Sequence, residues 1–476
     1  MLHSEIFYEV PGSLGVQTWG KETSSLKIQS EKQVRRQGTS IRVFMDNLPG
    51  LPDEPFSFPP EDLSSRFLVI PTQIYFSGGS QALLESWKEV SLKAWDSDQG
   101  YKSFLSGDKN TKALAKALTT TAGKNRRDQV RALYEYVRDE VRTLDGAEVW
   151  NRPLKADQVL EAKEGLATEK SLLLYALLDA VGIKARVVWV ANRNDGRAEL
   201  EVPNPAFFEA AILQVDAGAG EFLYLDPSDR SLAFGHLPPY YESTRAVITD
   251  RKNPEAIVLP AAPFADNGQK AELSLTVDAA GQVHGQGELL LTGHHAWRWL
   301  RAKDTPEETS KAWLEKLAAL FPGFDPAAVQ VEEDLREQRI RVRFQLEQRA
   351  ENVLGDEVSL QPARPFLATQ PLSLPPEKRL TPVMLPFASL ESTHLVLTWA
   401  EGFEIDALPK AAKLETCVGA YSLEVAADPA ARRVEVRRSF SRSQHEIHGR
   451  DGYTLLRDLY EKASLSDAQT LVLLRP

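Results

Sequence analysis

The stretch from Leu172 to Val190 constrains the fold of this chain more than any other part of it. It reads LLLYALLDAVGIKARVVWV, which is an apolar run, a glycine at position 182, and a run rich in valine. Glycine readily adopts the left-handed conformation that ends many helices, and valine favours strands. The sequence therefore predicts a buried helix, a stop at Gly182 and a buried strand, which is typical of a mixed α/β domain.

Polar residues immediately precede this predicted helix. The segment from Gly165 to Ser171 reads GLATEKS and is expected to be a loop that becomes the helix N-terminus. A helix N-terminus carries a partial positive charge and unpaired N–H groups, so it can activate a cysteine as a thiolate. This segment contains no cysteine.

Composition excludes several classes of protein. The chain has 476 residues and a net charge of -11, which disfavours binding to nucleic acid and anionic lipid. No apolar run approaches the roughly 18 to 20 residues that span a bilayer, so membrane insertion is not expected. The one cysteine, Cys417, excludes an intramolecular disulfide and CxxC metal sites. Its strand-like surroundings predict a half-buried structural thiol.

A chain of this length is expected to form roughly two to four domains. Short strand-like runs indicate an N-terminal β-sandwich module over residues 1–105, and mixed helices and strands indicate an α/β domain over residues 106–255. Alternating runs such as RIRVRFQLEQ indicate a β-rich sandwich module over residues 256–476. The predicted fold class is α+β multidomain.

The middle region has the clearest periodicity. Apolar residues recur at helical spacing from Val130 to Val141, which predicts an amphipathic helix. Three strand-like runs follow the apolar helix: ARVVWV, FFEAAILQV and EFLYLD. The turn at residues 217–220, AGAG, predicts that the last two form an antiparallel pair.

These pieces, in this order and spacing, resemble the transglutaminase-like (papain-like) superfamily. The matching segments are VRALYEYVRDEV, RPLKADQVLEAKEG, TEKSLLLYALLDAVGIKARVV, YLDPS and FGHLPP. The flanks, with SWKEVSLKAW before and GYTLLRDLYEKASLSDAQTLVLL after, resemble bacterial β-sandwich modules of unknown function. The N-terminal module is short, as if its first strands were missing.

The resemblance implies a Cys-His-Asp triad, in which a thiolate attacks an amide carbonyl and an oriented imidazole shuttles protons. The cysteine position falls on Ala167, the histidine position on Glu209 and the aspartate position on Asp226. Loss of the cysteine alone would fit an engineered inactive variant. Because the imidazole is missing too, we expect a naturally degenerate triad.

Simpler readings stand beside this one. The segment Asp226-Pro227-Ser228 can be a strand-ending turn in which the carboxylate accepts backbone N–H bonds. Thr168 or Ser171 as a substitute nucleophile is disfavoured by the high pKa of a hydroxyl. Glu209 and Asp226 alone make weak metal ligands, and His294 and His295 are expected in a turn, so no metal site and no cofactor is predicted.

The sequence thus predicts a degenerate transglutaminase- or peptidase-like protein that acts as a binding or scaffolding module. The expected binding residues are Trp150, Thr168, Phe208 and Glu209, and the expected partner is a peptide or an amide-bearing ligand. The groove would be acidic and would prefer basic or amine-bearing ligands.

Two other hypotheses stay open: an active amide hydrolase or amidotransferase with a non-cysteine mechanism, and a purely architectural middle domain. The resemblance also implies a bacterial protein that is periplasmic or otherwise exported, which fits a chain lacking its upstream segment.

Overall fold

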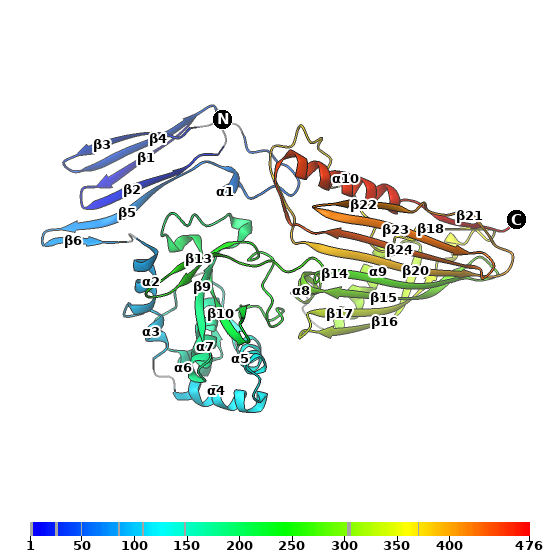
Figure 1. Cartoon of the computed structure of the whole chain (residues 1–476), viewed down its shortest axis with the longest axis horizontal. Helices are drawn as coiled ribbons and strands as arrows, with labels where there is room; N and C mark the ends of the chain where they lie inside the picture. The colour runs from blue at the N-terminus through cyan, green and yellow to red at the C-terminus, as the bar shows by residue number, and fades with distance from the viewer. Residues whose placement is uncertain are drawn as a thin grey trace. The chain divides into compact units, whose positions relative to one another are not determined.

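The computed structural model describes residues 3–23, 27–48, 50–83, 86–106, 109–146, 149–301, 306–369 and 371–476, with side chains for all of these except 306–308. The chain forms two compact units (Figure 1). The first unit comprises residues 1–53 and 58–261, and the second comprises residues 54–57 and 262–476. Strands dominate both ends of the chain and helices gather in its middle, which confirms the predicted α+β multidomain fold class; the three predicted domain boundaries stay a prediction.

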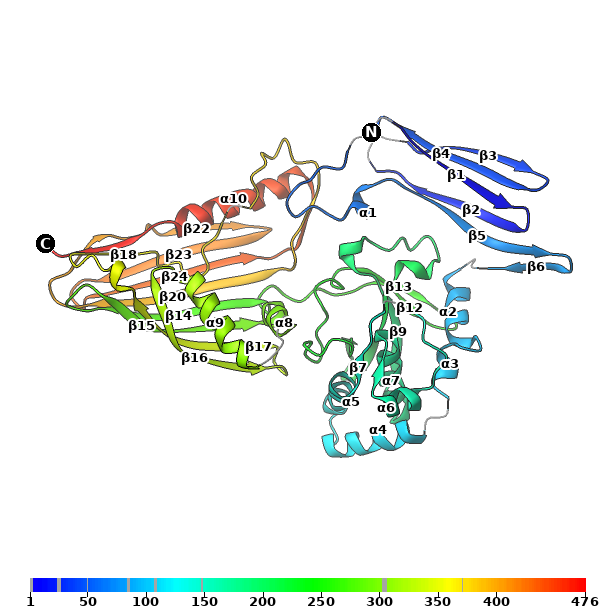
Figure 2. The same ribbon diagram turned by 180° about the vertical axis from the view of Figure 1, so that it is seen from behind.

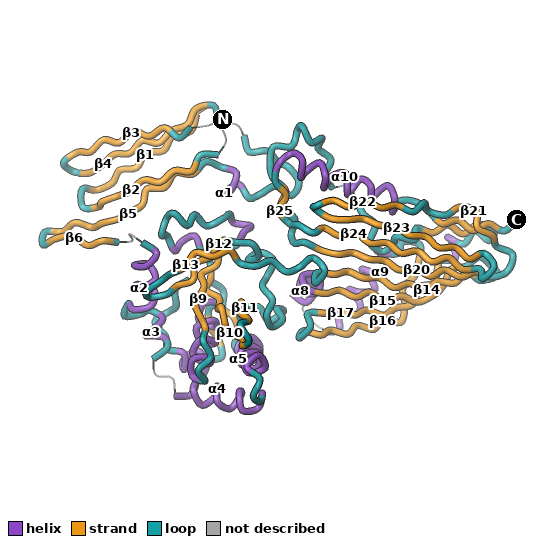
Figure 3. The backbone as a smooth tube through the Cα atoms, viewed as in Figure 1, coloured by secondary structure: helices purple, strands orange, loops and turns teal. Residues whose placement is uncertain are grey.

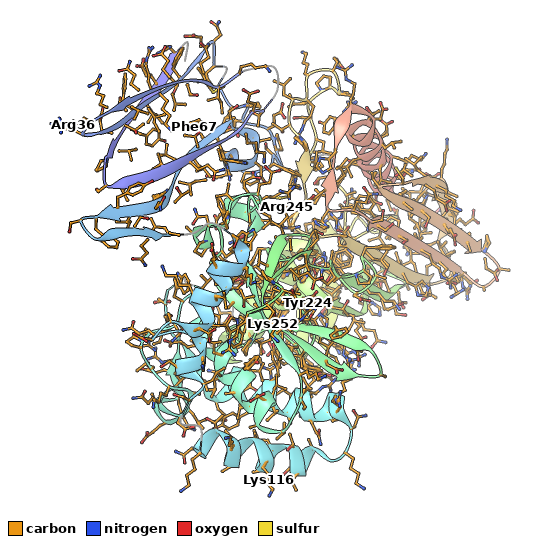
Figure 4. The ribbon with its side chains drawn as sticks, turned by 60° about the vertical axis from the view of Figure 1, so that its left-hand side comes forward. Arg36, Phe67, Lys116, Tyr224, Arg245 and Lys252 are labelled. Carbon is orange, nitrogen blue, oxygen red and sulfur yellow. The ribbon has the colours of Figure 1, made fainter. Side chains whose placement is uncertain are left out.

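The N-terminal strands form two small sheets in the first unit (Figure 3). The first has the order β1-β4-β3 and the second β2-β5-β6. Their bounds are β1 (His3–Pro11), β2 (Leu14–Lys21), β3 (Gln29–Arg35), β4 (Gly38–Asp46), β5 (Arg66–Phe76) and β6 (Gly79–Ala82), with helix α1 (Pro60–Leu63) before β5. Val10, Ile41 and Val43 are buried, and Phe67 (Figure 4) packs against them from the other sheet. This small core joins the two sheets as in a sandwich.

A five-stranded antiparallel sheet organises the rest of the first unit, in the order β11-β10-β9-β12-β13. The strands are β9 (Ala185–Val190), β10 (Ala210–Gly218), β11 (Glu221–Leu225), β12 (Arg245–Thr249) and β13 (Glu255–Val258). Alternate residues of β9 point to opposite faces, so that Val187 joins one core cluster and Val188 another. The predicted antiparallel pairing of residues 207–215 with 221–226 is confirmed.

Helices cover this sheet, as Figure 2 shows. They are α2 (Trp87–Asp96), α3 (Tyr101–Phe104), α4 (Lys109–Ala122), α5 (Arg126–Glu140), α6 (Ala156–Ala162) and α7 (Ala167–Ala180), with short strands β7 (Arg142–Thr143) and β8 (Glu164–Gly165) and 3₁₀ turns at Arg193–Asp195 and Pro205–Phe207. Helix α7 packs on β9 and β10 and against α4, α5 and α6. Gly182 has a φ of +74° just beyond α7, which confirms the predicted stop.

The second unit is built on an eight-stranded sheet in the order β16-β17-β15-β14-β20-β24-β23-β22. All of its neighbours are antiparallel except the parallel pair β14–β20. Its strands are β14 (Gly268–Val277), β15 (Val283–Thr292), β16 (Phe324–Asp334), β17 (Arg339–Gln348), β20 (Ser389–Trp399), β22 (Ala412–Thr416), β23 (Gly419–Asp428) and β24 (Arg433–Arg442). Buried and exposed residues alternate along β14 and β15, so one face of the sheet is core and the other is polar.

Smaller elements complete the second unit. The bounds are α8 (Gly293–Arg301), α9 (Pro306–Leu320), β18 (Glu357–Leu360), β19 (Val383–Met384), β21 (Glu404–Ala407), β25 (Glu446–Ile447), α10 (Gly449–Asp467) and β26 (Leu471–Leu474), with a 3₁₀ turn at Ala350–Asn352. Helix α10 packs against β22 and β23, and β18-β26-β21 form a second, three-stranded sheet.

The four residues 54–57 belong to the second unit although the chain on both sides of them belongs to the first. The buried Glu54 carboxylate accepts hydrogen bonds from the N–H groups of Leu380 and Thr381, both at 2.9 Å, and lies 3.2 Å from the Arg379 guanidinium. The Met384 N–H donates to the Phe56 carbonyl at 2.7 Å. These bonds fasten the segment to the second unit.

Two local predictions are wrong. His294 and His295 lie in α8 and not in a turn. The helix N-terminus there is capped by the Asn267 side chain, which accepts from the His294 N–H at 2.9 Å and is too distant in sequence to be recognised as a cap. Cys417 is exposed in the turn between β22 and β23, and not half-buried in a strand.

Candidate functional site

The first residue of α7 is Ala167, at the place where the sequence expected an activated cysteine. Its methyl group is partly buried and packs against an apolar cluster on one face of the five-stranded sheet. That cluster includes Ala210 and Tyr241, and Tyr224 of β11 also packs against it (Figure 4). Ala167 therefore packs against the face of the sheet that is opposite to the main helical core.

Thr168 fastens the start of α7 to β10. Its side chain is buried, and its hydroxyl oxygen accepts a hydrogen bond from the Ala211 N–H at 3.0 Å. An apolar side chain of similar size at position 168 would fill the same space but would leave the Ala211 N–H without its acceptor. The contact indicates a positioning role for Thr168.

Thr168→Val is expected to lower the free energy of unfolding by about 1–3 kcal/mol, because the Ala211 N–H is buried and would lose its acceptor. Ser171→Ala, three residues along the same helix, is the matched control. The buried Ser171 hydroxyl has no hydrogen-bond partner within the described part of the chain, so its removal should change little. Urea unfolding of the two variants measures the difference, and equal losses would contradict the role of Thr168.

Glu209 lies just before β10, and its N–H donates to the Val190 carbonyl at 3.0 Å. Its half-buried carboxylate accepts hydrogen bonds from Tyr241 and Asn192. Burial raises the pKa of Glu209, and the nearby Asp195 and Asp226 carboxylates raise it further, against the lowering effect of the two hydrogen bonds. Glu209 is thus a carboxyl group in a region already rich in negative charge.

Asp226 follows β11 and is 2% exposed. Its carboxylate accepts a hydrogen bond from the Ser228 N–H at 2.9 Å, which confirms the predicted strand-ending turn. Burial raises the pKa of Asp226, the hydrogen bonds from Ser228 lower it, and the Lys170 ammonium lowers it as well. Both Asp226 and Glu209 also act electrostatically on Tyr241, so the two carboxylates share one neighbourhood.

Lys170 supplies the cation of this neighbourhood. It is fully buried, and its Nζ donates to the carbonyl of Val141 at 2.5 Å and to the Thr143 hydroxyl at 3.1 Å. Burial lowers the pKa of Lys170 to about 8, although Asp226 partly opposes that change. Its signal in the sequence is a lysine within an otherwise apolar helix.

Glu169 anchors the first turn of α7. The carboxylate is completely buried and accepts from the Leu166 N–H at 2.9 Å and from the Arg152 guanidinium at 2.9 and 2.6 Å. Burial raises the pKa of Glu169, but the hydrogen bonds from Arg152 and from two backbone N–H groups outweigh burial and lower it overall. This ion pair holds the loop before α6 against the helix N-terminus.

Two of the predicted binding residues pack inside the domain. The Phe208 ring is buried, with the Trp87 ring 5.8 Å and the Trp189 ring 6.0 Å away. Trp150 is half-buried, with its ring 5.6 Å from that of Trp189. Both therefore belong to the core on the helical side of the sheet. Ala167 and Tyr241 belong to the cluster on the opposite side.

Tyr241 and Asn192 were not recognised from the sequence. They come from two separate loops, one after β9 and one before β12, and meet Glu209 only in the folded chain. Within the described ranges, no group of three or more histidine, cysteine and acidic side chains is placed to hold a metal ion.

Residues 112–218 match the model of the transglutaminase-like superfamily. The middle of this chain is a transglutaminase-like domain. The match spans α4, α5, α6 and α7 and ends with β10, so it includes Ala167 and Glu209. Residues 356–473 match DUF3858, a domain of unknown function with a solved structure. The resemblance predicted from the sequence is confirmed for the middle domain and for the C-terminal flank.

One solved structure shares the fold over nearly the whole chain. A "putative protease" from Parabacteroides distasonis ATCC 8503 superposes with a TM-score of 0.58 at 14% identity, covering 99% of this chain and 72% of that one. A "putative cysteine protease" from Cytophaga hutchinsonii has 14% identity over 48% of this chain and 75% of that one, with a TM-score of 0.21. The periplasmic domain of TgpA from Pseudomonas aeruginosa has 18% identity over 48% and 70%, with a TM-score of 0.20. No curated protein matches the sequence.

Within the transglutaminase-like domain, Ala167 thus lies at a helix N-terminus, Glu209 just before β10 and Asp226 just after β11. The assignment of Ala167 to the cysteine position of the family stays a prediction. As for membranes, none of the helices within the described residues combines the length and the apolar character that a bilayer crossing demands.

Proposed function

We propose that the transglutaminase-like domain is catalytically degenerate and binds a basic peptide or an amine-bearing group without cleaving it. The single observation that supports this most is that α7 begins at Ala167, a residue without a nucleophile, while a carboxylate, Glu209, lies just before β10 where the resemblance implies an imidazole. Neither methyl nor carboxylate can replace a thiolate and an imidazole in acyl transfer. The one cysteine of the chain, Cys417, belongs to the second unit.

The charge of the neighbourhood supports a cationic ligand. Three carboxylates lie near one another here. Asp195 and Asp226 both raise the pKa of Glu209. Asp226 and Glu209 in turn raise the pKa of Tyr241. Lys170 is held by a backbone carbonyl and a hydroxyl, so its ammonium group only partly offsets them. A lysine or amine ligand would stabilise the ionised form of Glu209.

Glu209→Gln is expected to remove a preference for cationic ligands. The test compares a short lysine peptide with the same peptide carrying acetyl-lysine, by calorimetry with the whole protein. We expect the wild type to bind the charged peptide about 10-fold more tightly, which corresponds to one charge-assisted hydrogen bond. The variant should bind both equally. Glu140→Gln, an exposed carboxylate on α5, is the control and should keep the preference.

The same preference should depend on pH. Because the pKa of Glu209 is raised, its carboxylate is ionised only above the raised value. The preference for the charged peptide is therefore expected to grow as the pH rises through the raised pKa of Glu209, which lies above the ordinary 4.5. At pH values below that raised pKa the preference should vanish. A preference that is flat with pH, or equal binding by the wild type, would contradict the proposal.

An amide substrate panel tests the alternative of an active enzyme. The wild type, Glu209→Gln and Asp226→Asn are incubated with glutamine-containing peptides and an amine acceptor, and ammonia release and peptide cleavage are followed. We expect no turnover by any of them. Turnover by the wild type that either substitution abolishes would show an active enzyme with a non-cysteine mechanism.

A further inference from the structure

A small cavity opens in the second unit, far along the chain from the α7 site. Its volume is about 170 Å³, and it lies between the inner face of the eight-stranded sheet and the segment of residues 359–364. The floor is apolar and buried, with Leu273, Leu346, Leu360 and Phe321 among its side chains. Exposed residues at the rim, including Ser359, leave it open to solvent.

One cation lines this apolar cavity. The half-buried Arg364 guanidinium donates from Nε to the Gln361 side-chain oxygen at 3.0 Å and from Nη1 to the Leu320 carbonyl at 3.0 Å. Both acceptors are neutral. These two bonds fix the plane of the guanidinium and leave the Nη2 donors without a hydrogen bond inside the described residues.

The positive charge of Arg364 has no counter-charge in the part of the chain that the structure describes. No carboxylate there forms an ion pair with it, and burial alone lowers the pKa of Arg364, with no acidic group acting against that effect. By contrast, the buried Arg438 and the half-buried Arg442 both pair with carboxylates. A partly desolvated cation is generally stabilised by an anionic partner.

We propose that this cavity binds a small carboxylic acid, with its apolar part on the leucine and phenylalanine floor and its carboxylate on the Arg364 guanidinium. Arginine N–H donors recognise carboxylates, and the Nη2 donors of Arg364 are held in a fixed plane by the bonds of Nε and Nη1. A cavity of about 150 Å³ with an aliphatic and aromatic lining holds a group the size of benzene. The apolar part of the ligand therefore has the size of a phenyl ring or a leucine side chain.

The proposal is tested with 3-phenylpropanoate and its neutral isostere, 3-phenylpropanamide. Ligand-observed NMR titration against the whole protein measures both dissociation constants. The acid should bind about 10- to 100-fold more tightly than the amide, as expected for a charge-assisted contact with arginine. N-acetylleucine and its neutral isostere N-acetylleucinamide form a second pair, and the same preference for the acid is expected if the site also accepts the carboxylate end of a peptide.

Two variants locate the binding. Arg364→Gln should abolish the preference for the acid, and Ser359→Phe should block the rim and weaken the acid and the amide alike. Arg349→Gln is the matched control, because this arginine is exposed and pairs with Asp325 outside the cavity. Thermal melting followed by circular dichroism checks that each variant is folded. If Arg364→Gln does not fold, the binding measured with Ser359→Phe decides whether the ligand occupies this cavity.

Three results would overturn the proposal. One is equal binding of acid and amide by the wild type. Another is the absence of binding of either ligand at about 10 mM, a concentration that reveals even millimolar affinities. The third is binding of the acid that survives both Arg364→Gln and Ser359→Phe.

Discussion

Asp467→Ala is expected to destabilise the second unit by about 3–5 kcal/mol, as breaking a buried ion pair commonly does. The Asp467 carboxylate is 1% exposed and accepts from the Arg438 guanidinium at 2.9 Å, from the Tyr421 hydroxyl at 2.7 Å and from the Ala368 N–H at 2.8 Å. Its removal would leave a completely buried guanidinium whose remaining charged partner, among the described residues, is Glu391 at 3.4 Å. Because Glu391 would still partly balance the charge of Arg438, we expect a loss near the lower end of this range.

Chemical denaturation followed by far-ultraviolet circular dichroism measures this effect. The matched control is Asp458→Ala, on an exposed position of the same helix α10. It should change the free energy of unfolding by less than about 0.5 kcal/mol. A loss for Asp467→Ala no larger than that of the control would mean that the network does not hold α10 against β23 and β24.

Lys170→Met is expected to change how stability depends on pH. The pKa of Lys170 is about 8 in the folded protein and 10.5 for an ordinary lysine. Between these values the unfolded chain binds more protons than the folded one, so the stability contributed by Lys170 rises with pH. One pKa unit corresponds to about 1.36 kcal/mol, so the difference between 10.5 and about 8 changes the free energy of unfolding by about 3 kcal/mol.

The measurement is the stability of the wild type minus that of Lys170→Met, at several pH values between about 7 and 11. This difference should be constant below pH 8 and should grow in favour of the wild type up to about pH 10.5. Loss of the hydrogen bonds to Val141 and Thr143 shifts the whole curve but not its slope. Lys184→Met, at an exposed position between α7 and β9, should give a flat difference, and a flat difference for Lys170→Met would contradict a depressed pKa.

Features governed by neighbours along the chain could be predicted from the sequence. Helix α7, its stop at Gly182 and the turn at Asp226 all follow from residues within a few positions of one another. The order of the motifs predicted the transglutaminase-like domain, which the family match confirms. Fold class could be predicted for the same reason, because strand and helix periodicities are local.

Features that depend on residues far apart in the sequence could not be predicted from it. The Glu209 carboxylate meets Tyr241 and Asn192 because three loops converge, and no periodicity encodes that convergence. Phe208 is an aromatic residue next to a predicted site residue, and only the positions of Trp87 and Trp189 show that it packs inward. Whether Ala167, Glu209 and Asp226 are the remains of a triad stays a prediction.

The fastening of residues 54–57 has a consequence for synthesis and for truncation. These residues leave the ribosome more than 300 positions before Leu380 and Thr381, whose N–H groups bind Glu54. During translation the Glu54 carboxylate therefore stays exposed to solvent until Leu380 and Thr381 have been synthesised. A fragment that starts at residue 262 would lack its own Glu54, and its Arg379 guanidinium would be left without that carboxylate. The second unit is thus complete only when the N-terminal part of the chain is present in the same molecule.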